Sequence, residues 1–166
     1  MIERFRENKE ITILILILTF AAALLRLYHI DFNSLWLDEG STYWISTQSF
    51  GTIWDGMLHG EFNPPLFYWI THIVLQILGH TEFALRLVPA IAGILTIPAV
   101  YILGKEVMDE KAGIIAAVFM LMSPWHVIYS QEARTYTLTM LVFVIACIYF
   151  FRWYKEPTTS NAAAVG

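Results

Sequence analysis

The chain has 166 residues, of which 57% are hydrophobic and 14% are charged, and its mean hydropathy is +0.58. Soluble domains contain roughly 45–50% apolar residues, so this composition excludes an ordinary soluble domain and indicates a membrane protein. The net charge of −4 and the pI of about 5.7 argue against nucleic acid as a partner. The single cysteine, Cys147, lies in an apolar run, so a disulfide framework is excluded and we expect the thiol to serve in packing.

Apolar runs of membrane-spanning length recur along the chain, and basic residues gather at their ends. This pattern predicts an all-α, polytopic membrane protein with about four transmembrane helices and two interfacial helices in its first outer loop. The predicted segments are a cytoplasmic tail (1–10), transmembrane helix 1 (11–30), an extracytoplasmic loop (31–82), transmembrane helix 2 (83–104), a cytoplasmic loop (105–111), transmembrane helix 3 (112–130), an outer turn (131–134), transmembrane helix 4 (135–151) and a cytoplasmic tail (152–166).

The first apolar run, Ile11–Leu25, has a rival interpretation as a signal peptide, because the three alanines 21–23 resemble a cleavage site. The apolar character resumes at Leu24, and Arg26 can extend outward from the helix end toward the interface. We therefore expect an uncleaved helix. In the second span, Pro89, Gly93 and Pro98 predict kinks.

The stretch from Leu27 to Leu85, which includes the loop at 31–82, contains no lysine or arginine but holds six carboxylates. Lysine and arginine stay cytoplasmic, so this acidic stretch is expected on the far side of the membrane. Its segment 64–79 is apolar but short for a span. If that segment lies in the interface, the basic clusters at residues 4–9, 105–111 and 152–155 all fall inside. The spacing of apolar residues from Phe50 to Leu58 predicts a second surface helix.

This topology brings two polar segments to one membrane face. One holds Asp38 and Glu39, and the other is the turn with Glu132 and Arg134; Arg86, at the outer start of the second span, joins them. Arginine offers a planar, permanently charged fork for phosphate oxygens. A partly desolvated carboxylate can take a proton from an attacking hydroxyl. The combination favours a substrate that is a lipid bearing phosphate.

Each of these signals also has a purely structural interpretation. Asp38 and Glu39 are equally suited to the N-cap and first turn of a helix starting near Gly40. Glu132 and Arg134 are also typical of a solvated turn between two spans, and Asn63 precedes two prolines that can simply start a helix.

Four motifs resemble a known family in their residues and in their order. They are Trp36-x-Asp38-Glu39, Asn63-Pro64-Pro65-Leu66-Phe67-Tyr68-Trp69, the segment from Thr81 to Pro89 that includes Arg86, and the segment from Tyr129 to Tyr136. The series resembles the N-terminal half of polytopic, lipid-phosphosugar-dependent glycosyltransferases of the GT-C type. These include the protein O-mannosyltransferase, aminoarabinose transferase and related glycosyltransferase 39/83 groups. The resemblance spans residues 10–155.

The resemblance implies a glycosyltransferase of the cell membrane, multi-pass, with a cytoplasmic N-terminus. It would transfer a sugar from a polyprenyl-phosphate-linked donor to a glycan, lipid or protein acceptor on the outer side, with inversion. The implied catalytic residues are Asp38 as base, with Glu39 and Glu132. The implied substrate-binding residues are Arg134, Arg86, Asn63 and Tyr136. No metal ligand is assigned, although Asp38, Glu39 and Glu132 offer hard oxygens suited to a divalent cation.

Two features depart from that family. Asn63 stands where many relatives carry a basic residue or histidine. Family members run to several hundred residues, so the final segment 158–166 is expected to be a cytoplasmic loop cut short. The competing class is a non-catalytic membrane subunit or a transporter fragment. A transporter places ionisable residues near the middle of its spans. The middles of the last three predicted spans are apolar here, which favours the enzyme.

Overall fold

The computed structural model describes residues 2–60 and 63–155, with side chains from Lys9 onward. Within these two ranges the chain forms helices and no strand, so the predicted all-α class is confirmed. The predicted tail from residue 156 onward and the side chains of the first basic cluster before Lys9 lie outside this described part. The helices are α1 (Ile2–Leu27), α2 (Leu37–Ser46), α3 (Phe50–His59), α4 (Pro65–Leu78), α5 (Glu82–Val107), α6 (Glu110–Met122), α7 (Pro124–Ser130) and α8 (Tyr136–Lys155).

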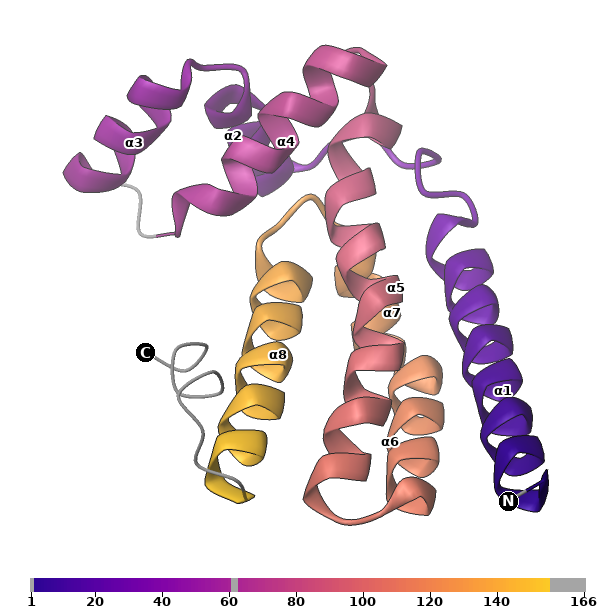
Figure 1. Ribbon diagram of the computed structural model, residues 1–166. Coiled ribbons are helices and arrows are strands. Elements are labelled where there is room, and N and C mark those ends of the chain that lie inside the picture. The colour runs from indigo at the N-terminus through magenta and orange to yellow at the C-terminus, as the bar shows by residue number, and fades with distance from the viewer. Residues whose placement is uncertain (1, 61–62, 156–166) are drawn as a thin grey trace.

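Among the residues that the structure describes, three helices are long and apolar enough to cross a membrane, namely α1 from Lys9 onward, α5 and α8. A fourth candidate is the pair α6 and α7, whose axes are bent by 63° at their junction. By contrast, α4 has only 14 residues, fewer than the roughly 17–25 that a crossing needs. The chain is therefore a multi-pass membrane protein. Figure 1 shows α1, α5, α6 and α8 running along one common direction, with α2, α3 and α4 gathered at one end.

The third predicted span, 112–130, is broken rather than straight. The break falls at Ser123-Pro124, because Pro124 has no N–H to continue the hydrogen bonds of α6. The Ser123 hydroxyl accepts the His126 N–H at 3.4 Å and so caps the new helix. This proline lies inside a charge-free apolar run, which is why the run was interpreted as a single helix.

The centre of the bundle is α5, which packs against α1, α4, α6, α7 and α8. It runs as one helix through Pro89 and Pro98. Two glycines let α5 and α6 approach closely: a Cβ on Gly104 would lie 2.7 Å from Gly113 Cα, and one on Gly113 would lie 2.5 Å from the Tyr101 carbonyl oxygen. Small residues at such crossings are typical of membrane helices.

The loop between α1 and α5 holds three helices, one more than the sequence predicted. The third helix is α2, which corresponds to the helix near Gly40 in the structural interpretation of Asp38 and Glu39. It begins at Leu37, so both carboxylates lie in its first turn and the N-cap is Trp36. The predicted helix at Phe50–Leu58 corresponds to α3, whose first turn is capped by the Ser49 hydroxyl.

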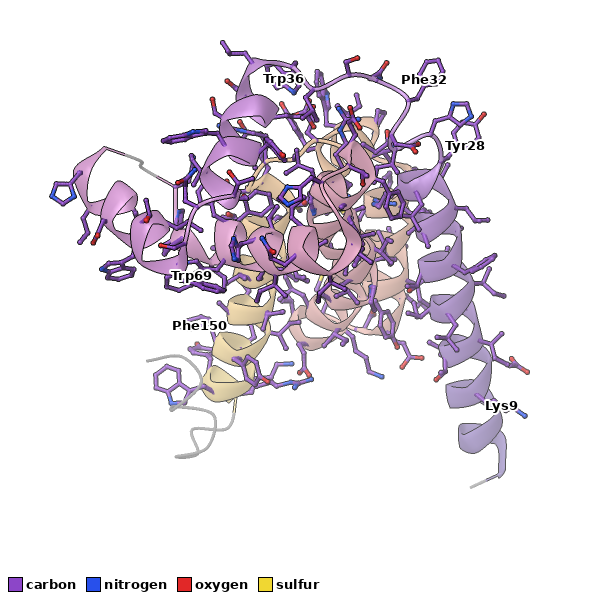
Figure 2. All side chains as sticks on the ribbon, turned by 90° about the horizontal axis from the view of Figure 1, so that it is seen from above. Lys9, Tyr28, Phe32, Trp36, Trp69 and Phe150 are labelled. Atoms are coloured by element: carbon purple, nitrogen blue, oxygen red, sulfur yellow. The ribbon has the colours of Figure 1, made fainter. Side chains whose placement is uncertain are left out.

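Aromatic side chains are exposed along this end of the molecule. Trp54 of α3 stacks on Trp69 of α4 with ring centroids 6.0 Å apart. In the view from above, Trp69 lies on the α3–α4 side, while Tyr28, Phe32 and Trp36 follow the connection from α1 to α2 (Figure 2). Amphipathic rings of this kind are enriched at membrane–water boundaries.

Arg26 does not extend outward from the end of α1 as the sequence suggested. Its side chain is fully buried, and its guanidinium donates to the Ala22 carbonyl at 3.3 Å and contacts His126 Nδ1 at 2.7 Å. The prediction was wrong because α7 packs against α1 and offers the side chain of His126 as an acceptor. Ala22 is buried in a cluster with Ile97 and Ala117.

Candidate functional site

The two polar segments singled out in the sequence lie at the same end of the bundle. The first turn of α2 carries Asp38 and Glu39, and the connection from α7 to α8 carries Glu132 and Arg134. The Ala133 N–H donates to Glu39 Oε1 at 2.9 Å, across 94 residues of sequence. The connection between α7 and α8 reaches toward α2 and α4 in Figure 1. The inferred arrangement of the spans was therefore sufficient to bring these segments together.

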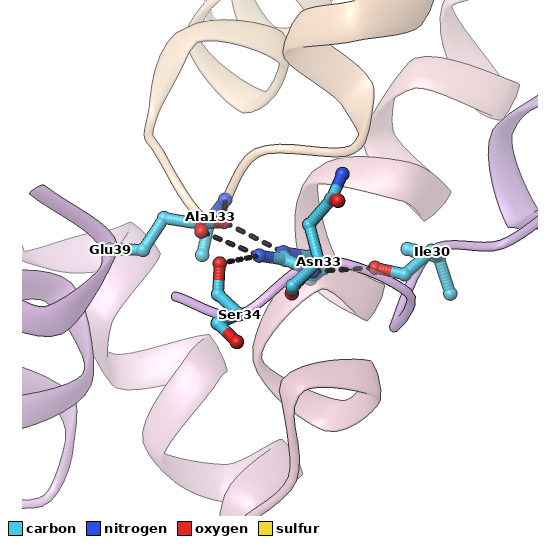
Figure 3. A network of polar contacts seen from close by, with 6 residues as sticks. Ile30, Asn33, Ser34, Glu39 and Ala133 are labelled. Atoms are coloured by element: carbon cyan, nitrogen blue, oxygen red, sulfur yellow. Dashed lines mark hydrogen bonds and ion pairs between the residues drawn. The ribbon is translucent and has the colours of Figure 1, made fainter. Parts of the chain in front are cut away.

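A buried ion pair between Glu39 and Arg86 holds this end of the molecule together. Arg86 NH2 lies 2.7 Å from Glu39 Oε2, and the side chains are 5% and 1% exposed. Arg86 Nε donates to Glu39 Oε1 at 2.8 Å, which makes the pair bidentate. Figure 3 shows this network of polar contacts, with Glu39 and Ser34 toward the left of the view and Asn33 and Ile30 toward the right.

The remaining donors of Arg86 go to backbone carbonyls. Its NH1 donates to Ile30 O and Asn33 O, both at 2.8 Å, and its NH2 donates to Ser34 O at 3.4 Å. A guanidinium has five N–H donors, so every one of them has an acceptor within the protein. Arg86 therefore offers no donor to a substrate phosphate in this structure, and its predicted substrate-binding role is not favoured. It ties α5 to the start of the outer loop.

The carboxylate of Glu39 is likewise fully occupied by hydrogen bonds within the protein. Burial raises the pKa of Glu39, but the hydrogen bonds from Arg86 and from the Ala133 N–H, with the charge of Arg86, outweigh burial and place that pKa below its usual value. Both carboxylate oxygens are occupied. A carboxylate held in this state is a poor proton acceptor, so the geometry favours positioning over catalysis for Glu39.

Glu132 lies beside this pair and responds to it in the opposite direction. A cavity of about 370 Å³ is lined by Glu132, Glu39, Arg86, Gln131 and Trp36, among others. Burial first, and then the negative charges of Glu39 and Asp38, raise the pKa of Glu132, against the opposing charge of Arg134. A raised carboxyl pKa in a polar cavity is typical of functional sites.

A second set of polar contacts near the ion pair involves Asn63, Arg134 and Tyr136, and the charge of Asp38 acts on it. Asn63, just before α4, donates to the Tyr68 hydroxyl at 3.3 Å and accepts from the Thr135 hydroxyl at 3.5 Å. The guanidinium of Arg134 lies over the Tyr136 ring, 5.8 Å from its centroid. Asp38 and the Tyr68 hydroxyl both lie close enough to act electrostatically on Arg134. The structure thus brings together the predicted residues Asp38, Asn63, Arg134 and Tyr136.

The oxygen donors considered for a divalent cation do not gather around one point. Among the side chains that the structure describes, no three His, Cys, Asp or Glu residues are grouped as a metal ion would require. Glu39 in particular gives both oxygens to Arg86 and Ala133.

Two residues near the site were missed from the sequence. Gln131 donates through Nε2 to the carbonyls of Leu25, Arg26 and Tyr28 at 3.3, 3.3 and 2.9 Å, and so caps the C-terminal end of α1. His126 accepts from the buried Arg26. The sequence did hold a signal for the contact between His126 and Arg26. His126 lies inside a predicted span and Arg26 at the end of another, and these residue types seldom lie in a bilayer without a partner.

Comparison with known proteins relates this chain to glycosyltransferases. Residues 63–165 match the family described as dolichyl-phosphate-mannose-protein mannosyltransferase. The chain is 29% identical over 144 residues to dolichyl-phosphooligosaccharide-protein glycotransferase 1 of Pyrococcus horikoshii, covering 84% of this chain and 14% of that protein. It is 28% identical over 116 residues to dolichyl-diphosphooligosaccharide–protein glycosyltransferase subunit stt3 of Schizosaccharomyces pombe, covering 66% of this chain and 15% of the subunit.

No solved structure matches the chain. The aligned part spans only about one seventh of these curated relatives, 14% in one case and 15% in the other. The family match nevertheless covers most of the chain and includes Asn63, Arg86 and the whole Tyr129–Tyr136 motif. The chain therefore belongs to the dolichyl-phosphate-mannose-protein mannosyltransferase family.

Proposed function

We propose that this chain forms the acceptor-activating end of a membrane glycosyltransferase. The enzyme transfers a sugar from a polyprenyl-phosphate-linked donor to an acceptor on the extracytoplasmic side, with inversion at the anomeric carbon. The acceptor is a hydroxyl group on a protein, glycan or lipid. The proposal places the N-terminus in the cytoplasm of a cell membrane and the helices α2, α3 and α4 along its outer surface.

The observation that carries the proposal is that two adjacent carboxylates differ in their hydrogen bonding. Glu39 gives both oxygens to Arg86 and Ala133, whereas Asp38, in the same helical turn, makes no side-chain hydrogen bond within the described ranges. Neighbouring residues on a helix point about 100° apart. Asp38 is therefore directed away from the ion pair, within electrostatic range of Arg134, and we infer that it accepts the proton.

Each residue of the site has its own role in the proposed transfer of the sugar. Asp38 takes the proton of the acceptor hydroxyl as its oxygen attacks the anomeric carbon from the face opposite the phosphate. The bond between that carbon and the phosphate oxygen breaks, and the electron pair leaves with the polyprenyl phosphate. Arg134 stabilises the charge on the departing phosphate. Asn63 and Tyr136 position the donor, and Glu132 orients Arg134 or binds the sugar.

The test is sugar transfer by the protein encoded by the complete reading frame that contains this chain. Asp38→Asn should abolish transfer, because asparagine cannot accept the proton, while folding and insertion stay unchanged. Asp55→Asn is the matched control, since Asp55 is an exposed carboxylate on α3 of the same loop and should leave transfer intact. Activity that persists in Asp38→Asn would refute the assignment of the base. A wild-type protein that transfers from no polyprenyl-phosphate donor would favour a non-catalytic membrane subunit instead.

Arg134 has its own measurement, the affinity for a polyprenyl-phosphate sugar analogue in nanodiscs. Loss of one charge-assisted contact to phosphate corresponds to about 1.5–3 kcal/mol, or roughly 10- to 150-fold in affinity, for Arg134→Ala. Arg134→Lys keeps the charge without the planar fork and should recover part of that loss. Unchanged affinity in both variants would assign Arg134 to a solvated turn.

A further inference from the structure

A small apolar pocket lies at the bend between α6 and α7, against the start of α8. Its volume is about 250 Å³, and its lining includes Met120, Trp125, His126, Tyr129, Tyr136 and Met140. Whole drug-sized ligands occupy pockets of about 300–1,000 Å³, so this pocket suits a section of a longer molecule. Trp125 and Tyr136 are 68% and 46% exposed, so the pocket opens on the outer surface of the bundle.

The pocket exists because the third span is broken. Pro124 starts α7 in a new direction, with the axes bent by 63°. In a bilayer, an interruption of a helix is tolerated where the chain is buried in protein or lines a cavity. Here the interruption borders a cavity whose walls are aromatic rings and methionine side chains.

A cation stands at one edge of this apolar space. The Tyr136 ring that lines the pocket also carries the Arg134 guanidinium, 5.8 Å from its centroid. The Tyr129 ring meets the Tyr136 ring edge-on at 5.1 Å. Arg134 Nε is buried and finds no acceptor among the described residues. An apolar pocket beside an arginine is complementary to an amphiphile with an anionic head and an apolar chain.

His126 contributes a polar side chain to the lining of the pocket. Its side chain is 6% exposed, and its Nδ1 faces the Arg26 guanidinium at 2.7 Å. A guanidinium can only donate, so Nδ1 is the acceptor and the proton resides on Nε2. That Nε2 has no partner within the described part of the chain. A buried N–H without an acceptor is unfavourable, and an oxygen of a bound ligand would satisfy it.

We propose that this pocket holds the section of the polyprenyl chain nearest the phosphate of the lipid-linked donor, with the phosphate at Arg134. This inference rests on the proposed function and adds to it the place where the carrier lipid lies. A lipid chain is favoured over a protein helix as the occupant for two reasons. The pocket volume of about 250 Å³ is too small for even one turn of a helix, which measures about 10–12 Å across with its side chains, and the Arg134 guanidinium lies at one edge.

The experiment compares two probes on the full chain in nanodiscs, undecaprenyl phosphate and butyl phosphate, which share the phosphate and differ in chain length. Met140→Trp fills the pocket from α8, and Met120→Trp fills it from α6 in case the first variant does not fold. Phe143→Trp is the matched control, because Phe143 is on the same helix as Met140 but is 67% exposed and does not line the pocket.

We expect either pocket-filling variant to weaken undecaprenyl phosphate at least 10-fold and to leave butyl phosphate unchanged, with no effect from Phe143→Trp. Equal affinity of the parent and a folded pocket-filling variant for the long chain would overturn the inference. Arg134→Ala reports separately on the phosphate. If it weakens both probes while the pocket variants weaken neither, the proposed function stands and the chain site fails. If it weakens neither while the pocket variants act on the long chain, the chain site stands and the phosphate assignment fails.

Discussion

Replacing Arg86 tests whether the Glu39–Arg86 pair stabilises the fold. In Arg86→Ala, Glu39 stays 1% exposed with the Ala133 N–H still bonded to it but with its counter-ion gone, and the carbonyls of Ile30, Asn33 and Ser34 lose their donors. Removing one partner of a buried ion pair costs about 3–5 kcal/mol, because the remaining charge is left uncompensated. We expect the free energy of unfolding to fall by that amount.

The chain contains a matched control at the opposite end of the bundle. Arg152 Nε contacts Glu106 Oε1 at 2.8 Å, a distance equal to that between Arg86 Nε and Glu39, but the two side chains are 43% and 25% exposed. Exposed pairs contribute about 0–1 kcal/mol, so Arg152→Ala should have a small effect. Both variants are measured by denaturant unfolding in detergent micelles, followed by tryptophan fluorescence.

A second substitution separates charge from shape. Glu39→Gln in the Arg86→Ala background removes the buried charge and should recover part of the lost stability. Arg86→Lys keeps the charge but offers fewer donors in a different geometry and should recover less than the full amount. If Arg86→Ala costs no more than Arg152→Ala, the pair does not hold the outer loop, and the structural role given to Arg86 is wrong.

Three other predictions concern pH, packing and topology. The lowered pKa of Glu39 means that its contribution is present above its unfolded value of about 4.3 and is lost as pH falls through its folded value, so Glu39→Gln should flatten the acid limb of a stability–pH curve. The pKa of Glu132 is raised, so its ionised carboxylate lowers stability at neutral pH, and Glu132→Gln should raise stability there. Gly113→Ala should destabilise the protein by about 1–3 kcal/mol, because the added methyl group would overpack against Tyr101. Gly56→Ala has open space around it and should be neutral or stabilising by up to about 1 kcal/mol. Thermal unfolding that ranks the two variants the other way would contradict the close approach of α5 and α6. Cysteines at Ser41 and His80 should react with a membrane-impermeant reagent from outside and one at Asp109 should not, whereas labelling at Asp109 without His80 would mean that α4 crosses the membrane.

The long apolar helices were predictable because hydropathy is a local property. The spans expected at 11–30, 83–104 and 135–151 correspond to the apolar part of α1 (Lys9–Leu27), to α5 and to α8, whose ends differ from the expected ones by one to four residues. The bend at Ser123-Pro124 was not predicted, since a single proline in a charge-free run still satisfies the criteria for a span. The helix α2 was expected only in the structural interpretation of Asp38 and Glu39, because Leu37 and Trp44 are exposed and leave no apolar stripe of helical period in its sequence.

The candidate site was predictable as a set of residues but not as a set of roles. The order of the spans indicated that Asp38, Glu39, Arg86 and Glu132 meet at one face. Which carboxylate pairs with Arg86 depends on a contact across 47 residues and on carbonyls of a loop, and neither leaves a local signal. The burial of Arg26 against His126 is a similar case, joining residues 100 positions apart.

The ion pair also constrains the order in which the protein can be assembled during synthesis. Glu39 emerges well before Arg86, and the Ala133 N–H that completes its set of hydrogen bonds emerges later still. Until α5 has entered the bilayer, the three helices of the outer loop have neither the arginine that neutralises Glu39 nor the helix against which α4 packs. The outer loop can therefore reach its final arrangement only after the connection between α7 and α8 has been synthesised.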